Sequence, residues 1–412
     1  MVGFLKLPPA RAAVPSLFIL AFMASLGPFG DTEYTPSLPS IARAMDVTYS
    51  KAQLTMTIYL VGFAFGQLLY GPVSDRFGRR PTILFAITTF FIGSMICMVS
   101  VNLYMMLFGR FVQSLGACAG GIISNAAVRD AFPPEKRTRM FLEVNTAFSL
   151  APGIGPIAGS LIDHYWGWES NFFLLSVLAI LLLICIVFLF PETNRHKNPK
   201  ATHPTRLLKN YLSLFRHVDF IYYVLVVGLG TGVVYCALVE APALVVNQIG
   251  LPSKTFVVVT LCVTGAFMLG AGICGLLSKF YSDAYLVIIG LLIMLTGSLA
   301  LGYFDYKDWV TLPTMLGAIS FIFSGIAFVV PVGTSLALSP FQKVAGSASS
   351  MAGCISMSMA SASTWLISIL PNRPSFDLFI TFSVLSSLGL VLALLAPLFA
   401  PGTVSRCCDD ED

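Results

Sequence analysis

Twelve long apolar segments are the feature of this sequence that most constrains its fold. A helix of roughly 20 residues crosses the hydrocarbon core of a bilayer, and each segment reaches about that length. Only 11% of the 412 residues are charged, whereas soluble domains carry about 25%. The sequence therefore predicts an all-α membrane protein with twelve transmembrane helices. The predicted spans are 14–38, 52–73, 81–100, 103–128, 139–163, 169–190, 218–246, 255–278, 284–303, 309–336, 344–370 and 375–399.

The loops between the spans are short, except for one in the middle of the chain. This loop is polar and basic and has the sequence PETNRHKNPKATHPTRLLKNYLSLFRH. It divides the spans into two sets of six, which predicts two pseudo-symmetric six-helix halves. We expect an N-terminal half at 1–190, a cytoplasmic linker at 191–217, a C-terminal half at 218–400 and a cytoplasmic acidic tail at 401–412. The first apolar stretch continues into a span, so no cleavable signal peptide is expected.

Lysine and arginine are distributed unequally between the two sides of this topology. With both termini in the cytoplasm, 18 of the 24 Lys and Arg residues lie in cytoplasmic segments and five lie in outer loops. The remaining one, Arg110, lies within the fourth span. Because the cytoplasmic loops of membrane proteins are enriched in Lys and Arg, the sequence predicts that both termini are cytoplasmic.

The two predicted halves share a short repeat. The stretch GQLLYGPVSD at 66–75 matches GAGICGLLSK at 270–279. The matched residues are Gly66 with Gly270, Gly71 with Gly275, and Ser74 with Ser278. An even number of spans in each half makes such repeats parallel, and transporters built in this way bind substrate between their halves. Chance similarity between apolar helices is the alternative explanation.

The loop between the second and third spans carries the most specific motif, GPVSDRFGRRP at 71–81. This motif resembles the cytoplasmic loop motif of the major facilitator superfamily. Gly71 and Gly78 allow a tight turn and a close approach of helices, and Arg76 adds positive charge to the cytoplasmic face. The positive charge of cytoplasmic loops alone would explain the arginines but not the two glycines.

The resemblance assigns partners to the other charged residues of this motif. It implies that Asp75 caps a helix start in the second half near 345–347, where the helix dipole favours a carboxylate. It also implies that Arg79 pairs with Asp130 at the cytoplasmic end of the fourth span. Together these contacts would hold the outward-open state.

Two more stretches resemble patterns of the same superfamily. RFVQSLG at 110–116 is similar to its R-x-x-Q-G pattern, with Ser114 in place of the first glycine. APGIGPIAGS at 151–160 is similar to its antiporter signature, which marks exporters that exchange substrate for protons. The small and helix-bending residues of this signature, which favour close packing of membrane helices, are Pro152, Gly155, Pro156 and Gly159. Generic packing of small residues is the alternative.

Three shorter motifs narrow the resemblance to the bacterial Bcr/CflA drug-export branch. They are D/E-x-Y-x-P-x-L-P at the end of span one, R-D after span four, and P-E-T at 191–193. The resemblance implies a monomeric drug:proton antiporter of the bacterial inner membrane. The chain departs from the branch at Thr32, where an aspartate is usual, and carries Asp31 and Glu33 on either side of it.

Charged residues inside the spans are the candidates for proton coupling. These residues are Asp31, Glu33, Arg110 and Glu240. At about 1.5 Å per residue, all of them lie roughly 8–10 Å from the outer ends of their spans. A charged residue within a span costs about 2.5–3.5 kcal/mol on insertion scales and by default has a functional role. We therefore predict that this group couples substrate to protons.

The two acids of span one are separated by about 200° around an ideal helix, so we expect only one to carry the proton. Glu33 is the first choice, because it adjoins Tyr34 and has a partial counterpart in Glu240, and Asp31 is the second. Burial favours the protonated carboxyl and a nearby arginine favours the ionised one, so a site that alternates between them loads and releases protons. A structural acid–arginine pair, or exposure to water at the helix end, is the alternative.

The substrate pocket is expected near the middle of the membrane, between the halves. Aromatic, methionine and amide side chains suit adaptable binding of apolar molecules. The candidate contacts are Tyr34, Tyr59, Phe63, Gln113, Tyr235 and Met268. Because the chain contains 33 Phe and 15 Met, packing between helices or against lipid is the alternative for any one of them.

Other classes of function are not indicated. The net charge of +4 is no signature of nucleic-acid binding. The four histidines and nine cysteines show no metal-ligand spacing, so no metal or cofactor is expected. The sequence has no nucleophile–base pattern of an enzyme, and it has no Walker A motif through which ATP would drive transport.

The sequence thus predicts a secondary transporter that exports amphipathic small molecules, either drugs or toxic metabolites, in exchange for protons. Two alternatives stay open. One is a dedicated carrier for a single metabolite, such as a siderophore or an amino-acid derivative, working as an exporter or an importer. The other is a membrane receptor that binds its ligand without proton-coupled flux, although the motifs and the short tails argue against it.

Overall fold

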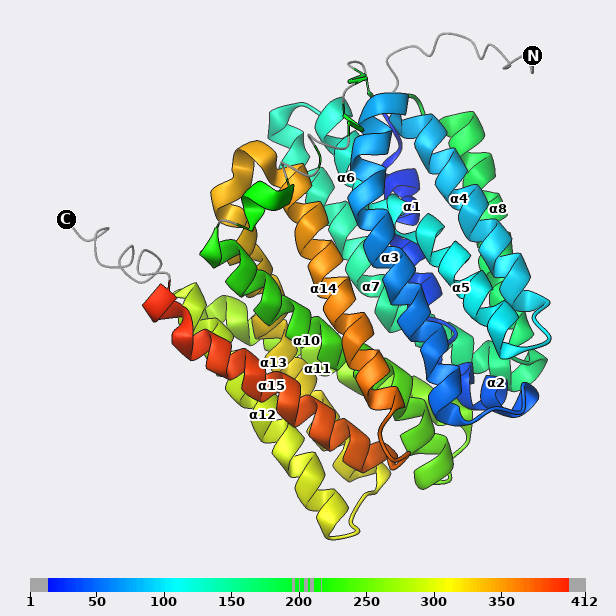
Figure 1. Cartoon of the computed structure of the whole chain (residues 1–412), viewed down its shortest axis with the longest axis vertical. Coiled ribbons are helices and arrows are strands. Elements are labelled where there is room, and N and C mark those ends of the chain that lie inside the picture. The colour runs from blue at the N-terminus through cyan, green and yellow to red at the C-terminus, as the bar shows by residue number, and fades with distance from the viewer. Residues whose placement is uncertain are drawn as a thin grey trace.

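Helices form all the regular secondary structure in the residues that the computed structural model describes, which are 14–194, 197–199, 201–203, 207, 211–215 and 217–399. The predicted tail 401–412 lies outside them. The helices before the central loop (Figure 1) are α1 Leu17–Thr32, η1 Thr35–Ser37, α2 Leu38–Ala44, α3 Tyr49–Phe77, α4 Arg79–Met98, α5 Leu103–Ala117, α6 Ala119–Ala131, α7 Pro134–Trp166 and α8 Glu169–Leu189.

A second set of helices follows the central loop. They are α10 Val218–Ala243, η2 Leu244–Gln248, η3 Ser253–Thr255, α11 Phe256–Leu277, α12 Asp283–Tyr306, α13 Leu312–Leu338, η4 Ser339–Val344, α14 Ala345–Ser368 and α15 Pro374–Phe399. Within the described residues, nine helical segments are long and apolar enough to cross a membrane by length and composition. The other predicted spans, α1, α7 and α14, pack along these segments and each other. The predicted all-α membrane fold is therefore confirmed.

The first span differs from its predicted extent of 14–38, because α1 ends at Thr32. Pro36 has no N–H to bond the carbonyl of Thr32, which a continuing helix would require. The hydroxyl of Thr35 donates to that carbonyl instead, at 2.9 Å. The chain then turns through η1 into α2, so Asp31 lies in the last turn of α1 and Glu33 directly after it.

Each half has its own hydrophobic core, and α10 contributes to both. One core gathers side chains from α1 to α8 together with Tyr235 and Val239 of α10 and Ala360 of α14. A second core consists entirely of side chains between Val226 and Ala393. The helices of the first half and those of the second therefore form two bodies that meet along α3, α10 and α14 (Figure 1).

Polar contacts between the halves gather at one end of the bundle, which we call the distal end. It carries α2, η2 and residues 369–373, and it lies at the bottom of Figure 1. Several hydrogen bonds cross between the halves there, among them three made by serine and threonine hydroxyls. These three join Ser50 Oγ to Asn372 Oδ1 at 2.6 Å, Ser160 Oγ to the carbonyl of Ser253 at 2.8 Å, and the hydroxyls of Thr57 and Thr364 at 3.0 Å.

At the opposite end, Glu192 of the P-E-T motif caps the start of α4. Its carboxylate accepts hydrogen bonds from the backbone N–H of Arg79 at 2.9 Å and of Arg80 at 3.2 Å. These N–H groups have no partner within the helix, and the helix dipole favours an anion beside them. Gly78 precedes them with φ of 111°, a conformation that other residues rarely adopt. The loop after α8 thereby fixes the turn between α3 and α4.

The glycine face of α7 packs against the backbone of α1 where the acids lie. A Cβ on Gly155 would lie 2.4 Å from Thr32 Oγ1, and one on Gly159 would lie 1.6 Å from the carbonyl oxygen of Glu33. Any side chain at Gly159 would therefore push α1 away. On another part of α7, Gly153 approaches Thr264 of α11, so this helix contacts both halves.

We predict that Glu192→Ala lowers the free energy of unfolding by about 1–2 kcal/mol, because two helix N–H groups lose their acceptor. Thermal denaturation of the purified protein in detergent measures the loss. The matched control is Glu135→Ala, since Glu135 is an exposed acid in the first turn of α7. An equal loss in both variants would show that the capping bonds of Glu192 are unimportant.

We also predict opposite effects for two glycine-to-alanine changes. Gly159→Ala should destabilise the protein by about 1–3 kcal/mol, because the new methyl group overlaps the backbone of α1. Gly265→Ala on α11 should leave stability unchanged or raise it, because nothing lies within 4 Å of its Cβ position and alanine favours the helix. The same denaturation assay compares them, and an unchanged melting temperature for Gly159→Ala contradicts the packing described above.

Candidate functional site

A buried arginine forms the centre of the first half. Arg110 of α5 is fully buried, and its guanidinium carbon lies 3.9 Å from the ring centroid of Tyr34 and 4.1 Å from that of Tyr59. The ring of Phe172 lies at 5.9 Å. Contacts between a guanidinium and aromatic faces stabilise the cation, and they do so more strongly where water is excluded. The two tyrosines therefore hold a positive charge inside the membrane domain.

Hydrogen bonds orient this guanidinium without neutralising it. Arg110 Nη1 donates to the carbonyl of Gly30 at 3.2 Å and to Gln113 Oε1 at 2.5 Å. Gln113 in turn donates to Ser94 Oγ at 2.7 Å. Among the described residues, Arg110 Nε and Nη2 have no hydrogen-bond partner, and no carboxylate oxygen lies within 4.0 Å of the guanidinium. The site thus contains a buried cation without a direct counter-ion.

Asp31 and Glu33 are both buried, but they have different neighbours. Asp31 Oδ2 accepts a hydrogen bond of 2.8 Å from the hydroxyl of Tyr235, which belongs to α10 in the other half. Neither carboxyl oxygen of Glu33 has a hydrogen-bond partner in the described part of the chain. Arg110 is close enough to act electrostatically on both acids. Asp31 therefore joins the two halves, whereas the carboxyl of Glu33 makes no hydrogen bond with the described residues.

Glu240 occupies a separate place near the distal end. Its Oε2 accepts a hydrogen bond from Gln53 Nε2 of α3, and the hydroxyl of Tyr49 donates to the neighbouring carbonyl of Val239. The charged group that acts on Glu240 is Asp377, and not Arg110. The sequence predicts that four charged residues lie together at one depth. Asp31, Glu33 and Arg110 do lie together, whereas Glu240 lies apart from them.

The structure places five of the six predicted substrate contacts together. Tyr34, Tyr59 and Gln113 contact Arg110, as described above, and Tyr235 contacts Asp31. The ring of Phe63 lies 6.2 Å from that of Tyr59. Met268 on α11 is 62% exposed, so it does not share the buried surroundings of the other five. The sequence indicated the depth of Met268 in the membrane, but it did not indicate the direction in which the side chain points.

The charged residues of the 71–81 motif meet one another at the end opposite the distal end. Arg79 Nε lies 2.9 Å from Asp130 Oδ2, and Arg79 Nη1 lies 2.5 Å from Asp75 Oδ1. The carboxylate of Asp75 therefore bonds within its own half, and its side chain is 51% exposed. Capping of the second-half helix near 345–347 is not the contact that Asp75 makes in this arrangement.

Two other residues of the 71–81 motif make contacts at the same end of the bundle. Arg76 Nη1 donates to Thr202 Oγ1 of the central loop at 2.5 Å. Gly71 faces the second half, because a Cβ there would lie 3.8 Å from Ser350 Oγ. Pro152 and Pro156 lie inside α7 without ending it. Thus Gly71 is the member of the motif that approaches the other half.

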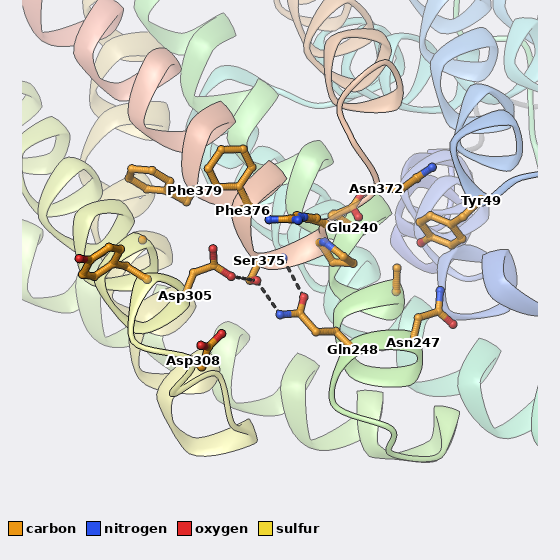
Figure 2. A pocket seen from close by; sticks show the side chains of 15 residues that line it. Tyr49, Glu240, Asn247, Gln248, Asp305, Asp308, Asn372, Ser375, Phe376 and Phe379 are labelled. Atoms are coloured by element: carbon orange, nitrogen blue, oxygen red, sulfur yellow. Dashed lines mark hydrogen bonds between the residues drawn. The ribbon is translucent and has the colours of Figure 1, made fainter.

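The sequence analysis missed Gln53 and Tyr49, which connect α3 to α10. Gln53 is an amide within a predicted span, a signal that could have identified it. Tyr49 lies outside the predicted span 52–73, because the first turns of α3 are more polar than the rest. Tyr49 adjoins a cavity of about 830 Å³ at the distal end, which we call the distal pocket (Figure 2). Tyr49 and Glu240 line it together with residues of η2, α12 and α15.

The chemistry of the central site is that of charge and proton binding. In the part of the chain that the structure describes, no three His, Cys, Asp or Glu side chains gather closely enough to hold a metal ion. The site offers one buried cation, two buried carboxyls and several aromatic faces. The chemistry of such a set suits a proton or a molecule with charged and apolar parts, and one of its bonds crosses between two helical bodies.

Comparisons with known proteins agree with this architecture. The chain matches the family model of the Major Facilitator Superfamily over residues 17–338. It is 26% identical over 379 residues to multidrug resistance protein D of Escherichia coli (strain K12), covering 92% of each chain. It is 27% identical over 352 residues to the bicyclomycin resistance protein homolog of Haemophilus influenzae, covering 82% of this chain and 85% of that protein.

The xylose transporter XylE from E. coli shares the fold. Its structure superposes with a TM-score of 0.72 at 17% sequence identity, covering 95% of this chain and 97% of that one. The predicted resemblance is thereby confirmed, including the relation to drug-resistance proteins of the Bcr/CflA type. Because the family model covers most of the chain and the fold agrees with it, this protein belongs to the Major Facilitator Superfamily and is a multi-pass membrane transporter.

Proposed function

We propose that this transporter exports amphipathic small molecules, drugs among them, in exchange for protons. The hydrogen bond between Asp31 and Tyr235 carries the proposal, because it joins a buried acid of one half to the other half. The similarity to multidrug resistance protein D and to the bicyclomycin resistance protein homolog supports drugs as substrates. The resemblance of 151–160 to the antiporter signature supports exchange for protons.

Asp31 is the coupling group in this proposal. Separation of the halves at the distal end removes the hydroxyl of Tyr235 from Asp31 and admits water. Closure restores the bond and buries the carboxyl again. An ionised carboxylate is costly in the buried state unless enough donors surround it, so the protonation of Asp31 and the arrangement of the halves depend on each other.

Glu33 and Arg110 set the electrostatics around this group. Glu33 is fully buried with no hydrogen-bond partner among the described residues, and it holds a proton in this arrangement because an ionised form would be unsatisfied. Arg110 supplies a fixed positive charge that favours release of the proton from either acid. Substrate binds beside them, against Tyr34, Tyr59 and the other gathered side chains.

The excess of Lys and Arg on one side supports an orientation with the distal end outside a bacterial cell and both termini in the cytoplasm. Hydrogen bonds close the halves at the outer end, and Asp75 is not engaged with the second half at the inner end. This arrangement is therefore the inward-facing one. The halves, 1–190 and 218–400, rock as units within one monomer, and the 71–81 motif latches the inner end in the outward-facing state.

Inside-out vesicles with an acidic interior test the proposal directly. Cationic, neutral and anionic compounds are added outside, and acridine orange reports the pH gradient. A compound that is pumped inward releases protons and restores fluorescence. Competition by one compound among many would instead identify a dedicated carrier. Binding of compounds without any proton release would reject antiport and favour a receptor.

The first prediction from this mechanism concerns the two acids. Asp31→Asn should abolish the proton release that a substrate causes, while the substrate still binds, because asparagine keeps the bond to Tyr235 but carries no proton. Glu143→Gln is the matched control, since Glu143 is a partly exposed acid paired with Arg139. Full coupling in Asp31→Asn together with none in Glu33→Gln would assign the proton to Glu33. Full coupling in both variants would remove these acids from the mechanism.

The second prediction concerns the shape of the buried cation. Arg110→Lys keeps the positive charge but loses the planar group that lies against Tyr34 and Tyr59. We expect transport in the same vesicles to fall by about tenfold or more, with normal amounts of folded protein. Wild-type transport by Arg110→Lys would show that charge alone suffices at this position.

A further inference from the structure

The distal pocket is large enough for a ligand and lies apart from the central site. Its volume of about 830 Å³ is within the range of about 300–1,000 Å³ that is typical of small-molecule sites. It lies in the second half, between α10, α12 and α15, with Tyr49 of α3 at its edge. Of the residues proposed for proton coupling, Glu240 is the one that lines it.

The pocket is lined by more acidic than basic side chains. The carboxyls of Glu240, Asp305 and Asp308 line it, against the single cation Arg373. The ion pairs found among the described residues belong to Arg79 and Arg139 at the other end, so none of these carboxyls is ion-paired. Asp305 and Asp308 are less buried than Glu240, so their carboxylates are the charges from which a positive ligand would gain.

A fourth acid stands behind the lining. Asp377 is 1% exposed, and its Oδ2 accepts the backbone N–H of Arg373 at 2.8 Å. Its Oδ1 has no partner in the part of the chain that the structure describes. Asp377 acts electrostatically on Glu240, and Asp305 acts on Asp377 in the same way. Asp305, Asp377 and Glu240 thus lie close enough to repel one another beside one cavity, and a bound cation would relieve this repulsion.

The walls of the pocket favour an organic cation over a metal ion. Aromatic side chains provide faces that attract cations and apolar groups, and they are Tyr49, Tyr306, Phe376 and Phe379. The acids are too dispersed to chelate one ion, because no three His, Cys, Asp or Glu side chains in the described residues form such a group. Figure 2 shows Asp305 and Asp308 on one side of the cavity and Glu240 on another.

The pocket is also preorganised. Gln248 of η2 donates to Ser375 Oγ at 2.7 Å and accepts from the N–H of Ser375 at 3.1 Å. The hydroxyl of Ser375 donates to Asp305 Oδ1, so a chain of bonds connects η2, α15 and α12 (Figure 2). A site whose side chains are already fixed loses less entropy when it binds.

We propose that the distal pocket binds an organic cation with an aromatic or apolar body. The inference does not depend on proton exchange, because the pocket contains neither Asp31 nor Arg110. Binding of such a cation would affect the contacts between the halves at the distal end. A cation that approaches Glu240 competes with Gln53 for the same carboxylate, so occupancy weakens a bond that joins α3 to α10.

Equilibrium dialysis of the purified full-length protein tests the proposal with two probes of the same shape and opposite charge. Tetraphenylphosphonium is the cation, and tetraphenylborate is the anion. The test variant is Asp305→Asn combined with Asp308→Asn, which removes two charges and keeps the shape. Asp46→Asn is the matched control, because Asp46 is exposed at the distal end and has a φ of 51°, against 52° for Asp308.

We expect the double variant to bind tetraphenylphosphonium about tenfold more weakly or worse, with wild-type affinity in Asp46→Asn and weak binding of the borate throughout. Weaker binding in the double variant would locate this affinity in the distal pocket, because Asp305 and Asp308 line it and neither belongs to the central site. Equal binding of both probes, or wild-type affinity in the double variant, would overturn the proposal. Absence of substrate-driven proton release in vesicles would reject antiport without changing these binding results.

Discussion

The placement of Arg110 between Tyr34 and Tyr59 is the interaction on which the arrangement of the first half depends. A guanidinium inside a membrane domain is stable only if aromatic faces or hydrogen-bond acceptors replace water around it. Tyr34 reaches it because α1 ends at Thr32, and the carbonyl of Gly30 supplies an acceptor at 3.2 Å. The end of α1 at Thr32 and the buried charge of Arg110 in α5 therefore depend on each other.

The same end of α1 brings the acids to two different boundaries. Asp31 meets Tyr235 across the interface between the halves, whereas the backbone of Glu33 meets the glycine face of α7 within its own half. Close helix packing and the proposed proton coupling are thus combined in three consecutive residues. In the proposed cycle the contact between Asp31 and Tyr235 breaks and forms as the halves move. The contact between Glu33 and α7 stays constant, because both lie in the same half.

Most of the fold could be predicted from the sequence, but only part of the site. Apolar length and loop charge predict the spans after the first to within a few residues, since the bilayer selects for length and hydrophobicity rather than for particular contacts. The depth of a residue in the membrane follows from its position along the span. Equal depth correctly predicted that Asp31, Glu33 and Arg110 lie together. It failed for Glu240, because depth does not specify which way a side chain points. The neighbours of Glu240 are Gln53 and the distal pocket.

The sequence by itself determined the class of protein, the number of spans, the repeat and the motifs, because these follow from composition and spacing along one chain. It also determined that Glu192 belongs to a recognisable motif, but not that this residue caps α4. Only the tertiary structure decided which acid crosses to the other half and which carboxyls surround the distal pocket. Those features depend on the relative rotation of helices that are far apart in sequence, and local periodicity does not encode that rotation.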